Sequence, residues 1–101
     1  PTRRSSDLVS RLRPDIAFIG TNGLSTGFGL STPDPDEAAV KRAIIRAARR
    51  TFVVADAEKF DAELLVSFGD LADIDVFVTD AAPPRELSEA LQAADAEVWI
   101  A

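Results

Sequence analysis

The sequence contains no cysteine, no histidine and no tyrosine. Without cysteine the chain has no disulfide, no thiolate zinc site and no cysteine nucleophile. Without histidine it lacks the commonest general base and the commonest metal ligand of proteins. Catalysis by this chain would have to use Asp, Glu, Lys or Ser side chains. An enzyme is therefore the less favoured class, and the sequence predicts neither a metal nor a cofactor.

Basic residues and long apolar runs are also scarce. The chain has 11 Lys and Arg residues against 17 Asp and Glu residues, and its formal net charge is −6. Since nucleic-acid-binding modules usually present a basic face, this charge argues against direct DNA binding by this segment. The longest apolar runs have about five residues, far fewer than the roughly 20 of a membrane helix. No signal-peptide pattern opens the chain, so we expect a soluble cytoplasmic protein.

The order of apolar runs predicts an α/β fold. Runs at residues 16–19, 51–55 and 75–79 are continuous where a one-sided strand would alternate, so we expect three adjacent, parallel and buried strands. A fourth run at residues 97–100 predicts an edge or final strand. Helical patterns between the runs indicate a mostly parallel open sheet with flanking helices and right-handed crossovers. The length of 101 residues suits one small domain or part of one.

The strongest helix signal begins at Asp34. Asp34 is expected as the N-cap, Pro35 at the first helical position and Glu37 as the residue that closes a capping box. The pattern runs on to Arg49 and Arg50, whose charges suit the negative end of the helix dipole. Further helical segments are expected at residues 6–13 and 84–94, with a short helical turn near Leu71.

Polar residues gather where the predicted strands end, which is where ligands bind in open parallel sheets. The first strand runs into Gly20, Thr21, Asn22 and Gly23. Such a glycine-rich segment can expose backbone N–H groups to an anion. Its spacing does not match the GxGxxG fingerprint, and Asn22 and Gly23 can equally form a tight turn without a ligand.

The second and third strands are followed by charged residues. Lys59 is placed to reach a phosphate or a carboxylate, and Asp56 and Asp80 can accept hydrogen bonds from sugar hydroxyls. Each has a structural alternative, because an exposed Lys is usually only solvated and an acid just after a strand often forms a turn or a cap.

Glu37 and Lys41 are one helical turn apart, and such a pair contributes about 0.2–0.5 kcal/mol. They join the candidate site only if the start of their helix lies near Gly20. The basic residues of this region are otherwise expected on the solvent side of the helix; they are Lys41, Arg42, Arg46, Arg49 and Arg50.

Four motifs, taken together, resemble the effector domain of DeoR-family repressors of sugar metabolism. They occur in order over about 70 residues: GTNG at 20–23, EAAVKRA at 37–43, ADAEKF at 55–60 and DIDVFVTD at 73–80. The resemblance implies that residues 1–101 are the C-terminal portion of a Rossmann-related sensor domain similar to ribose 5-phosphate isomerase and glucosamine 6-phosphate deaminase. The chain begins with Pro1, not with methionine, which also suggests a segment of a longer protein.

The resemblance also implies a mechanism and partners. In the parent protein a winged helix-turn-helix, absent from this chain, would bind operator DNA. A phosphorylated sugar, with fructose 1-phosphate a reasonable candidate, would bind the sensor and release the repressor. The parent protein is expected to be a homo-oligomer.

Position by position, the resemblance assigns roles to several candidates. Asn22 and Gly23 lie in the loop that corresponds to the acidic substrate loop of the isomerase, Glu37 stands near the position of its catalytic carboxylate, and Lys59 stands where a lysine binds the substrate phosphate. The isomerase has aspartates where this chain has Thr21, Asn22 and Gly23, which favours binding without turnover. An isomerase-like enzyme with Glu37 as base is the alternative, and a dimerisation segment is a third.

Overall fold

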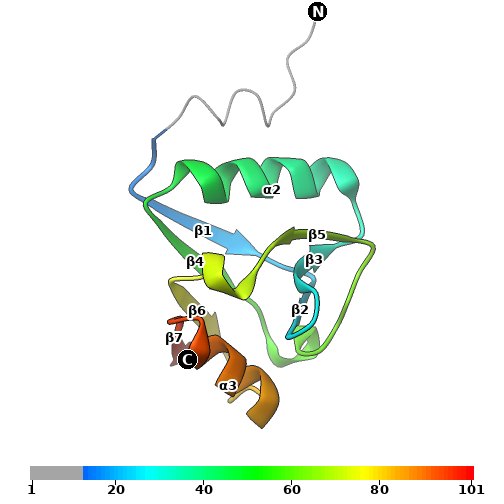
Figure 1. Cartoon of the computed structure of the whole chain (residues 1–101), viewed down its shortest axis with the longest axis vertical. Coiled ribbons are helices and arrows are strands. Elements are labelled where there is room, and N and C mark those ends of the chain that lie inside the picture. The colour runs from blue at the N-terminus through cyan, green and yellow to red at the C-terminus, as the bar shows by residue number, and fades with distance from the viewer. Residues whose placement is uncertain (1–12) are drawn as a thin grey trace, which may run out of the picture.

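A computed structural model of the chain describes residues 13–101. The helix expected at residues 6–13 lies outside this range apart from Arg13, which is not helical. The described residues form two sheets and two α-helices, whose arrangement can be followed in Figure 1. The main sheet consists of the parallel strands β1 (Ile16–Gly20), β4 (Arg50–Val54), β6 (Val76–Thr79) and β7 (Glu97–Ile100), in that order. The expected α/β class, the parallel pairing of the first three strands and the edge position of the fourth are confirmed.

A second, antiparallel sheet was not expected. It consists of β2 (Gly23–Ser25), β3 (Gly29–Thr32) and β5 (Val66–Gly69), with β3 in the middle. The segment that the sequence suggests as a glycine-rich loop is therefore largely a β-hairpin. Gly29 has φ +70° and begins its second strand, and the hydroxyl of Ser25 accepts a hydrogen bond from the N–H of Phe28 (3.0 Å) in the turn.

Helix α2 (Pro35–Ala47) begins as expected and ends early. The carboxylate of Asp34 accepts a hydrogen bond from the N–H of Asp36 (2.9 Å), and Pro35 is the first helical residue. Glu37 does not close a capping box, because its carboxylate pairs with Lys41. The helix does not reach Arg50, which begins β4, because the N–H of Arg50 donates to the carbonyl of Asp15 beside β1 (2.9 Å).

We expect Asp34→Ala to lower the free energy of unfolding by about 1 kcal/mol, the usual loss for an N-cap carboxylate. The cause is the lost hydrogen bond to the N–H of Asp36. Urea unfolding is the measurement. Asp36→Ala is the control, because it removes an exposed carboxylate from the same helical turn and leaves the cap hydrogen bond in place. It should change the stability by less than about 0.5 kcal/mol, since the higher helix propensity of Ala offsets the lost attraction to the helix dipole.

The remaining helices are short. They are η1 (Ala57–Lys59), η2 (Leu71–Asp73), which confirms the turn expected near Leu71, and α3 (Arg85–Ala93). In α3 the side chains of Leu87 and Leu91 are fully buried, as expected for the helix predicted at residues 84–94. No helix in the described part of the chain is long and apolar enough to cross a membrane.

One hydrophobic core lies on one face of the main sheet. Strands, helices and the small sheet all contribute side chains to it, among them Ala17, Ile19, Val53, Phe77, Ala38, Leu87, Leu91, Leu24, Leu30 and Phe68. Both helices and the small sheet therefore cover the same face. Strand order explains this arrangement: each strand lies next to its predecessor in the same direction across the sheet, and right-handed crossovers then put every connection on one side.

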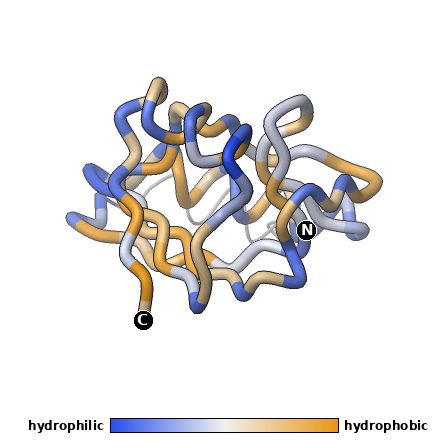
Figure 2. The backbone as a smooth tube through the Cα atoms, turned by 90° about the horizontal axis from the view of Figure 1, so that it is seen from below, coloured by the Kyte–Doolittle hydropathy of each residue, from blue (hydrophilic) through white to orange (hydrophobic). Residues whose placement is uncertain are grey.

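The other face of the main sheet is open, which corrects the expectation of strands buried on both sides. Ile16 and Phe18 of β1 are 46% and 70% exposed, while Ala17 and Ile19 between them are buried. Val54 of β4 and Trp99 of β7 are also about half exposed, and Figure 2 shows that hydrophobic residues continue to the C-terminus. The continuous apolar runs indicated two apolar faces correctly, but the second face is covered only in part: Phe52 and Val76, in register with Phe18, are buried while Phe18 is not.

Candidate functional site

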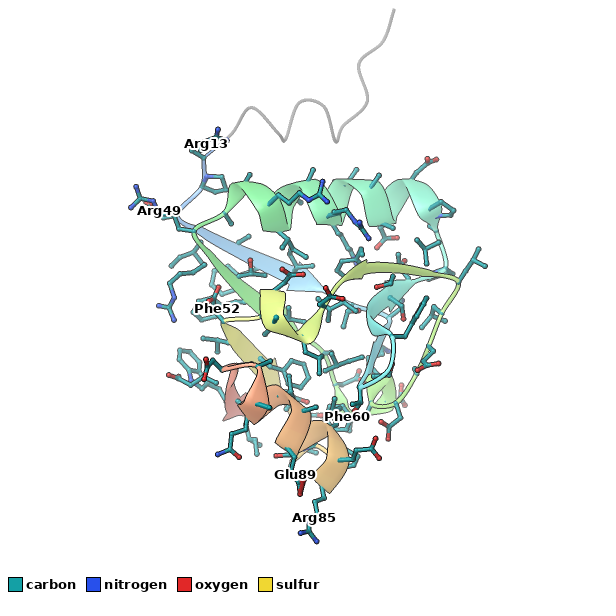
Figure 3. All side chains as sticks on the ribbon, in the orientation of Figure 1. Arg13, Arg49, Phe52, Phe60, Arg85 and Glu89 are labelled. Atoms are coloured by element: carbon teal, nitrogen blue, oxygen red, sulfur yellow. The ribbon has the colours of Figure 1, made fainter. Side chains whose placement is uncertain are left out.

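The carboxyl ends of β1 and β4 bring two of the predicted segments together. Gly20 is the in-register neighbour of Val54 at this edge of the sheet. Leu24 then forms a bridge with Phe60, and its carbonyl accepts a hydrogen bond from the N–H of Asp61 (2.8 Å); Figure 3 labels Phe60 beside the small sheet. The segment that follows Gly20 and the turn that contains Lys59 therefore adjoin each other, as the strand order predicts.

Lys41 ties helix α2 to this edge. Its ammonium donates to the carbonyl of Gly20 (2.7 Å) and lies 2.8 Å from the carboxylate of Glu37. It also lies 5.2 Å from the ring centre of Phe68, and only 17% of its side chain is exposed. The condition for including Glu37 and Lys41 in the site is met. The expectation that Lys41 lies on the solvent side of the helix is wrong.

The Gly20–Gly23 segment is only partly open to a ligand. The hydroxyl of Thr21 donates to the carbonyl of Gly23 (2.7 Å), and the N–H of Asn22 donates to the carbonyl of Ser31 (3.2 Å). A Cβ atom at Gly23 would lie 2.4 Å from a backbone oxygen, so this glycine is required by packing. Gly20, in contrast, faces open space, and the side chain of Asn22 is exposed. Asn22 and Gly23 do not form a tight turn, because Asn22 is a bend and Gly23 begins β2. Hydrogen bonding and packing account for Thr21 and Gly23, while Gly20 and Asn22 remain candidates for contact with a ligand.

Asp56 and Asp80 hold the turn that carries Lys59. The carboxylate of Asp56 caps η1 by accepting from the N–H of Glu58 (3.0 Å), and that of Asp80 accepts from the N–H of Ala57 (2.9 Å). The ammonium of Lys59 lies 3.7 Å from the carboxylate of Asp56, and its side chain is 31% exposed. Both aspartates thus have the structural role that the sequence left open, and Lys59 keeps a partly exposed, loosely paired charge.

A hollow of about 200 Å³ lies beside this turn, between the carboxyl ends of β4 and β6. Its lining is mainly apolar and consists of Val54, Ala55, Asp56, Val78, Thr79, Asp80 and Ala101. The hydroxyl of Thr79 is buried and has no hydrogen-bond partner among the described residues. Asp56 belongs to both the hollow and the Lys59 turn, so the two features form one continuous edge.

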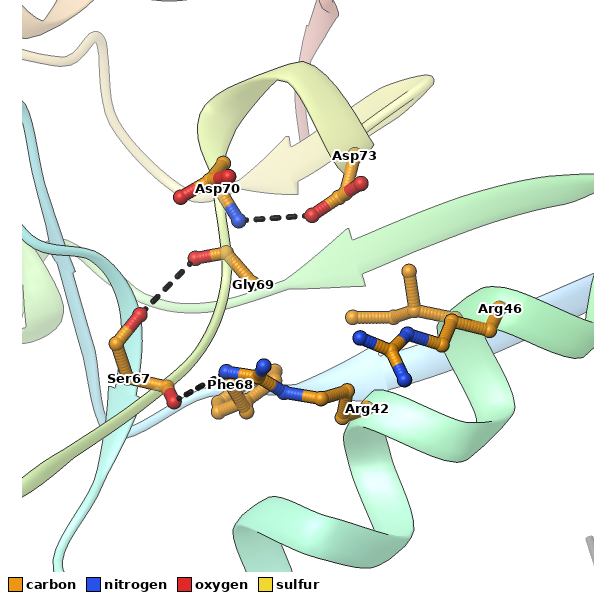
Figure 4. A pocket seen from close by; sticks show the side chains of 8 residues that line it. Arg42, Arg46, Ser67, Phe68, Gly69, Asp70 and Asp73 are labelled. Carbon is orange, nitrogen blue, oxygen red and sulfur yellow. Dashed lines mark hydrogen bonds between the residues drawn. The ribbon is translucent and has the colours of Figure 1, made fainter.

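A second cavity, of about 240 Å³, was not expected. Figure 4 shows it between α2, β5 and η2, with Arg42 and Arg46 on the helix and Asp70 and Asp73 on the opposite wall, where the carboxylate of Asp73 accepts from the N–H of Asp70 (2.8 Å). Arg42 and Arg46 are exposed, as expected, and they also line this cavity, where Arg42 donates to the carbonyl of Ser67 (3.1 Å). Their spacing of one helical turn was the only sequence signal for this arrangement. Because the lining contains two cations and two carboxylates, it is balanced in charge.

Residues 13–101 contain no cluster of three or more acidic side chains arranged to hold a metal ion. The candidate site lies at the carboxyl edge of the main sheet and contains two ammonium groups, three carboxylates and a glycine that faces open space. Its members are Gly20, Asn22, Glu37, Lys41, Asp56, Lys59 and Asp80.

Comparison with known proteins gives consistent matches. The model of the DeoR C-terminal sensor domain matches residues 3–81. The chain is 35% identical over 98 residues to the HTH-type transcriptional regulator GlpR of Haloferax volcanii. The aligned region covers 97% of this chain and 38% of that protein. It is 40% identical over 73 residues to the uncharacterized HTH-type transcriptional regulator FruR of Bacillus subtilis, covering 72% of this chain and 29% of that protein. It is 33% identical over 85 residues to the glycerol-3-phosphate regulon repressor of Escherichia coli, covering 84% of this chain and 34% of that protein. The chain thus spans between 29% and 38% of the length of these relatives.

Proposed function

Because the chain belongs to the family of DeoR C-terminal sensor domains, we propose that it binds a phosphorylated sugar at the carboxyl edge of its main sheet and so controls a transcriptional regulator. The family consists of regulatory sensor domains, and the relatives named above are transcriptional regulators. The chain is a sensor domain and not an enzyme. The alternative in which Glu37 acts as a catalytic base is therefore set aside.

One observation carries the choice of this edge: two lysines from different elements reach the ends of neighbouring parallel strands. Lys41 binds Gly20 at the end of β1, and Lys59 follows β4. Ligands of open parallel sheets bind at this position, outside the carboxyl ends of the strands. We assign Gly20, Asn22 and Lys59 to direct contact with the effector.

Lys41 and Asp56 are assigned supporting roles and no direct contact with the effector. Lys41 already binds Gly20 and Glu37, so it holds Gly20 in place relative to helix α2. Asp56 is the present partner of Lys59 at 3.7 Å. A phosphate dianion would replace this long contact by a charge-assisted hydrogen bond, which is typically worth about 1.5–3 kcal/mol.

The sensor acts within a longer protein in this proposal. Residues 1–101 are the C-terminal portion of the effector domain, and a separate segment of a cytoplasmic, homo-oligomeric parent protein binds operator DNA. The net charge of −6 suits this division, because acidic residues outnumber basic ones in this chain and DNA-binding modules usually carry a basic face. Fructose 1-phosphate is the first candidate effector. Glycerol 3-phosphate is the second, prompted by the name of the relative from Escherichia coli.

The test is a titration of operator release by sugar phosphates with the complete regulator. Release at micromolar to millimolar concentrations by a phosphorylated sugar, and not by the same sugar without phosphate, is the expected result. Release by unphosphorylated sugars alone, or by none of the compounds, would contradict a phosphate-binding site.

We expect Glu37→Gln to keep the response to effector, with affinity reduced less than about tenfold. Glu37 contacts Lys41 from the exposed end of the helix, and such pairs contribute little. Operator release by the effector is measured for both proteins. An isomerase activity that disappears in Glu37→Gln would instead restore the enzyme alternative.

A further inference from the structure

The chain that follows Lys59 is attached to the small sheet at two points. The N–H of Asp61 donates to the carbonyl of Leu24 in β2 (2.8 Å). The N–H of Leu64 donates to the hydroxyl oxygen of Ser31 in β3 (3.0 Å). Strand β2 also continues directly from the glycine-containing segment at the end of β1. The two segments assigned to the effector are therefore joined to each other through β2.

Asp61 makes its attachment in an unusual backbone conformation. Its φ is +62°, in the left-handed region. Glycine adopts this conformation freely, aspartate and asparagine tolerate it, and β-branched residues avoid it. The side chain of Asp61 is exposed and forms no hydrogen bond or ion pair within the described part of the chain. The structural contribution of Asp61 therefore comes from its backbone and not from its carboxylate.

We propose that Asp61 is a positioning residue for Lys59 in the effector site, an inference that rests on the function proposed above. The turn is held on its other side by the carboxylate of Asp80, which accepts from the N–H of Ala57 (2.9 Å). Only the attachment through Asp61 connects the turn to β2. A residue that leaves the left-handed region breaks the hydrogen bond to Leu24 and releases Lys59 from its position beside the end of β1. Effector affinity then falls, because the effector binds only the fraction of molecules in which the turn is in place.

Two substitutions at Asp61 separate its backbone from its carboxylate. Asp61→Val introduces a β-branched side chain that disfavours a positive φ, while Asp61→Gly keeps this conformation accessible. The measurement is the effector concentration that half-releases the complete regulator from operator DNA. We expect Asp61→Val to raise this concentration roughly tenfold. Asp61→Gly should stay within about threefold of the wild type, although it also lacks the carboxylate.

Asp95→Val is the matched control. Asp95 is also exposed, also has φ +62°, and its N–H donates to the carbonyl of Gln92 (3.0 Å). It precedes β7 at the amino end of the main sheet, opposite the candidate edge. The substitution therefore imposes the same backbone strain far from Lys59. It should leave the half-release concentration within about twofold of the wild-type value.

Three results would overturn the role of Asp61. The first is a response of Asp61→Val equal to that of the wild type. The second is equal weakening by Asp61→Gly and Asp61→Val, which would assign the effect to the lost carboxylate. The third is weakening by Asp95→Val as large as that by Asp61→Val, which would assign the effect to a general loss of stability.

A wild-type regulator that no sugar phosphate releases would contradict the proposed function, and hydrogen exchange then tests Asp61 by itself. The N–H of Leu64 is present in every variant and reports whether the segment stays attached to β3. It should exchange roughly tenfold faster in Asp61→Val than in Asp61→Gly. Equal exchange rates would contradict the role of Asp61 whether or not an effector binds. If Asp61→Val does not fold, Asp61→Ala replaces it in both measurements, with smaller effects in the same direction.

Discussion

Replacing Lys59 by Ala should weaken binding of the sugar phosphate by roughly ten- to a hundredfold, which corresponds to the loss of one charge-assisted hydrogen bond. The side chain of Lys59 is partly exposed and its ion pair with Asp56 is long. Its loss should therefore cost at most about 1 kcal/mol of folding stability, as for other surface pairs. The measurement is the effector concentration that half-releases the complete regulator from operator DNA. Operator affinity without effector should stay unchanged, because Lys59 can affect release only through its contact with the ligand.

The matched control for Lys59→Ala is Arg49→Ala. Arg49 is also a cation in a long ion pair, here with Asp15 at 3.8 Å, and it directly precedes β4 at the amino end of the strand, opposite the candidate edge. Arg49→Ala removes the same net charge at that opposite edge. If both variants weaken the effector response equally, long-range charge and not contact with Lys59 is responsible, and the assignment of Lys59 fails.

Gly29→Ala should lower the free energy of unfolding by about 2 to 5 kcal/mol, as the sum of backbone strain and overpacking. Gly29 has φ +70°, a conformation that side chains disfavour, and an added Cβ would lie 2.3 Å from the carbonyl oxygen of Gly69. That oxygen belongs to the backbone of β5, so relief requires the small sheet to shift. Urea unfolding, followed by the emission of Trp99, the one tryptophan in the sequence, measures the effect.

Gly27→Ala provides the comparison for Gly29→Ala. An added Cβ at Gly27 would meet only the side chain of Glu63, at an ordinary distance of 3.6 Å. Its effect should stay within about 0.5 kcal/mol. Similar losses in the two variants would mean that glycine flexibility in the unfolded chain, and not the close contact with Gly69, determines the stability.

Apolar runs and cap residues were enough to predict the main sheet. The strands at residues 16–19, 51–55 and 75–79 and the start of α2 at Asp34 were found with shifts of at most one residue at each end. These features depend on local patterns, which a sequence displays directly. The end of α2 was misplaced because Ala48 and Arg49 suit a helix locally, and the pairing of Arg50 beside β1 overrides that preference.

The small sheet could not be predicted because its strands are short and pair over long distances. Strand β2 has three residues, and β5 pairs with β3 although α2 and β4 lie between them in the chain. Glycines at positions 20, 23, 27 and 29 resemble a loop in composition. Two of them, Gly23 and Gly29, are needed instead because other backbone atoms approach them closely.

The candidate site was predicted in outline and not in its contacts. The rule that polar residues after parallel strands share one edge placed Gly20, Asp56 and Lys59 together. It could not indicate that Lys41 binds the carbonyl of Gly20, since that contact joins residues 21 positions apart. Nor could it distinguish the caps formed by Asp56 and Asp80 from ligand contacts, because both roles use the same carboxylate at the same position.

The order of the main sheet also determines how the chain can assemble during synthesis. Strands β1, β4, β6 and β7 lie in the order in which the ribosome produces them. Each new strand finds its neighbour already made and adds to a free edge, so no later strand has to insert between two that are already paired. Because strands are added at the edge, few of them remain unpaired at any time. This lowers the risk of mispairing for a sheet whose contacts are distant in sequence. Translation itself can therefore guide the register of this sheet, from β1 outward to β7.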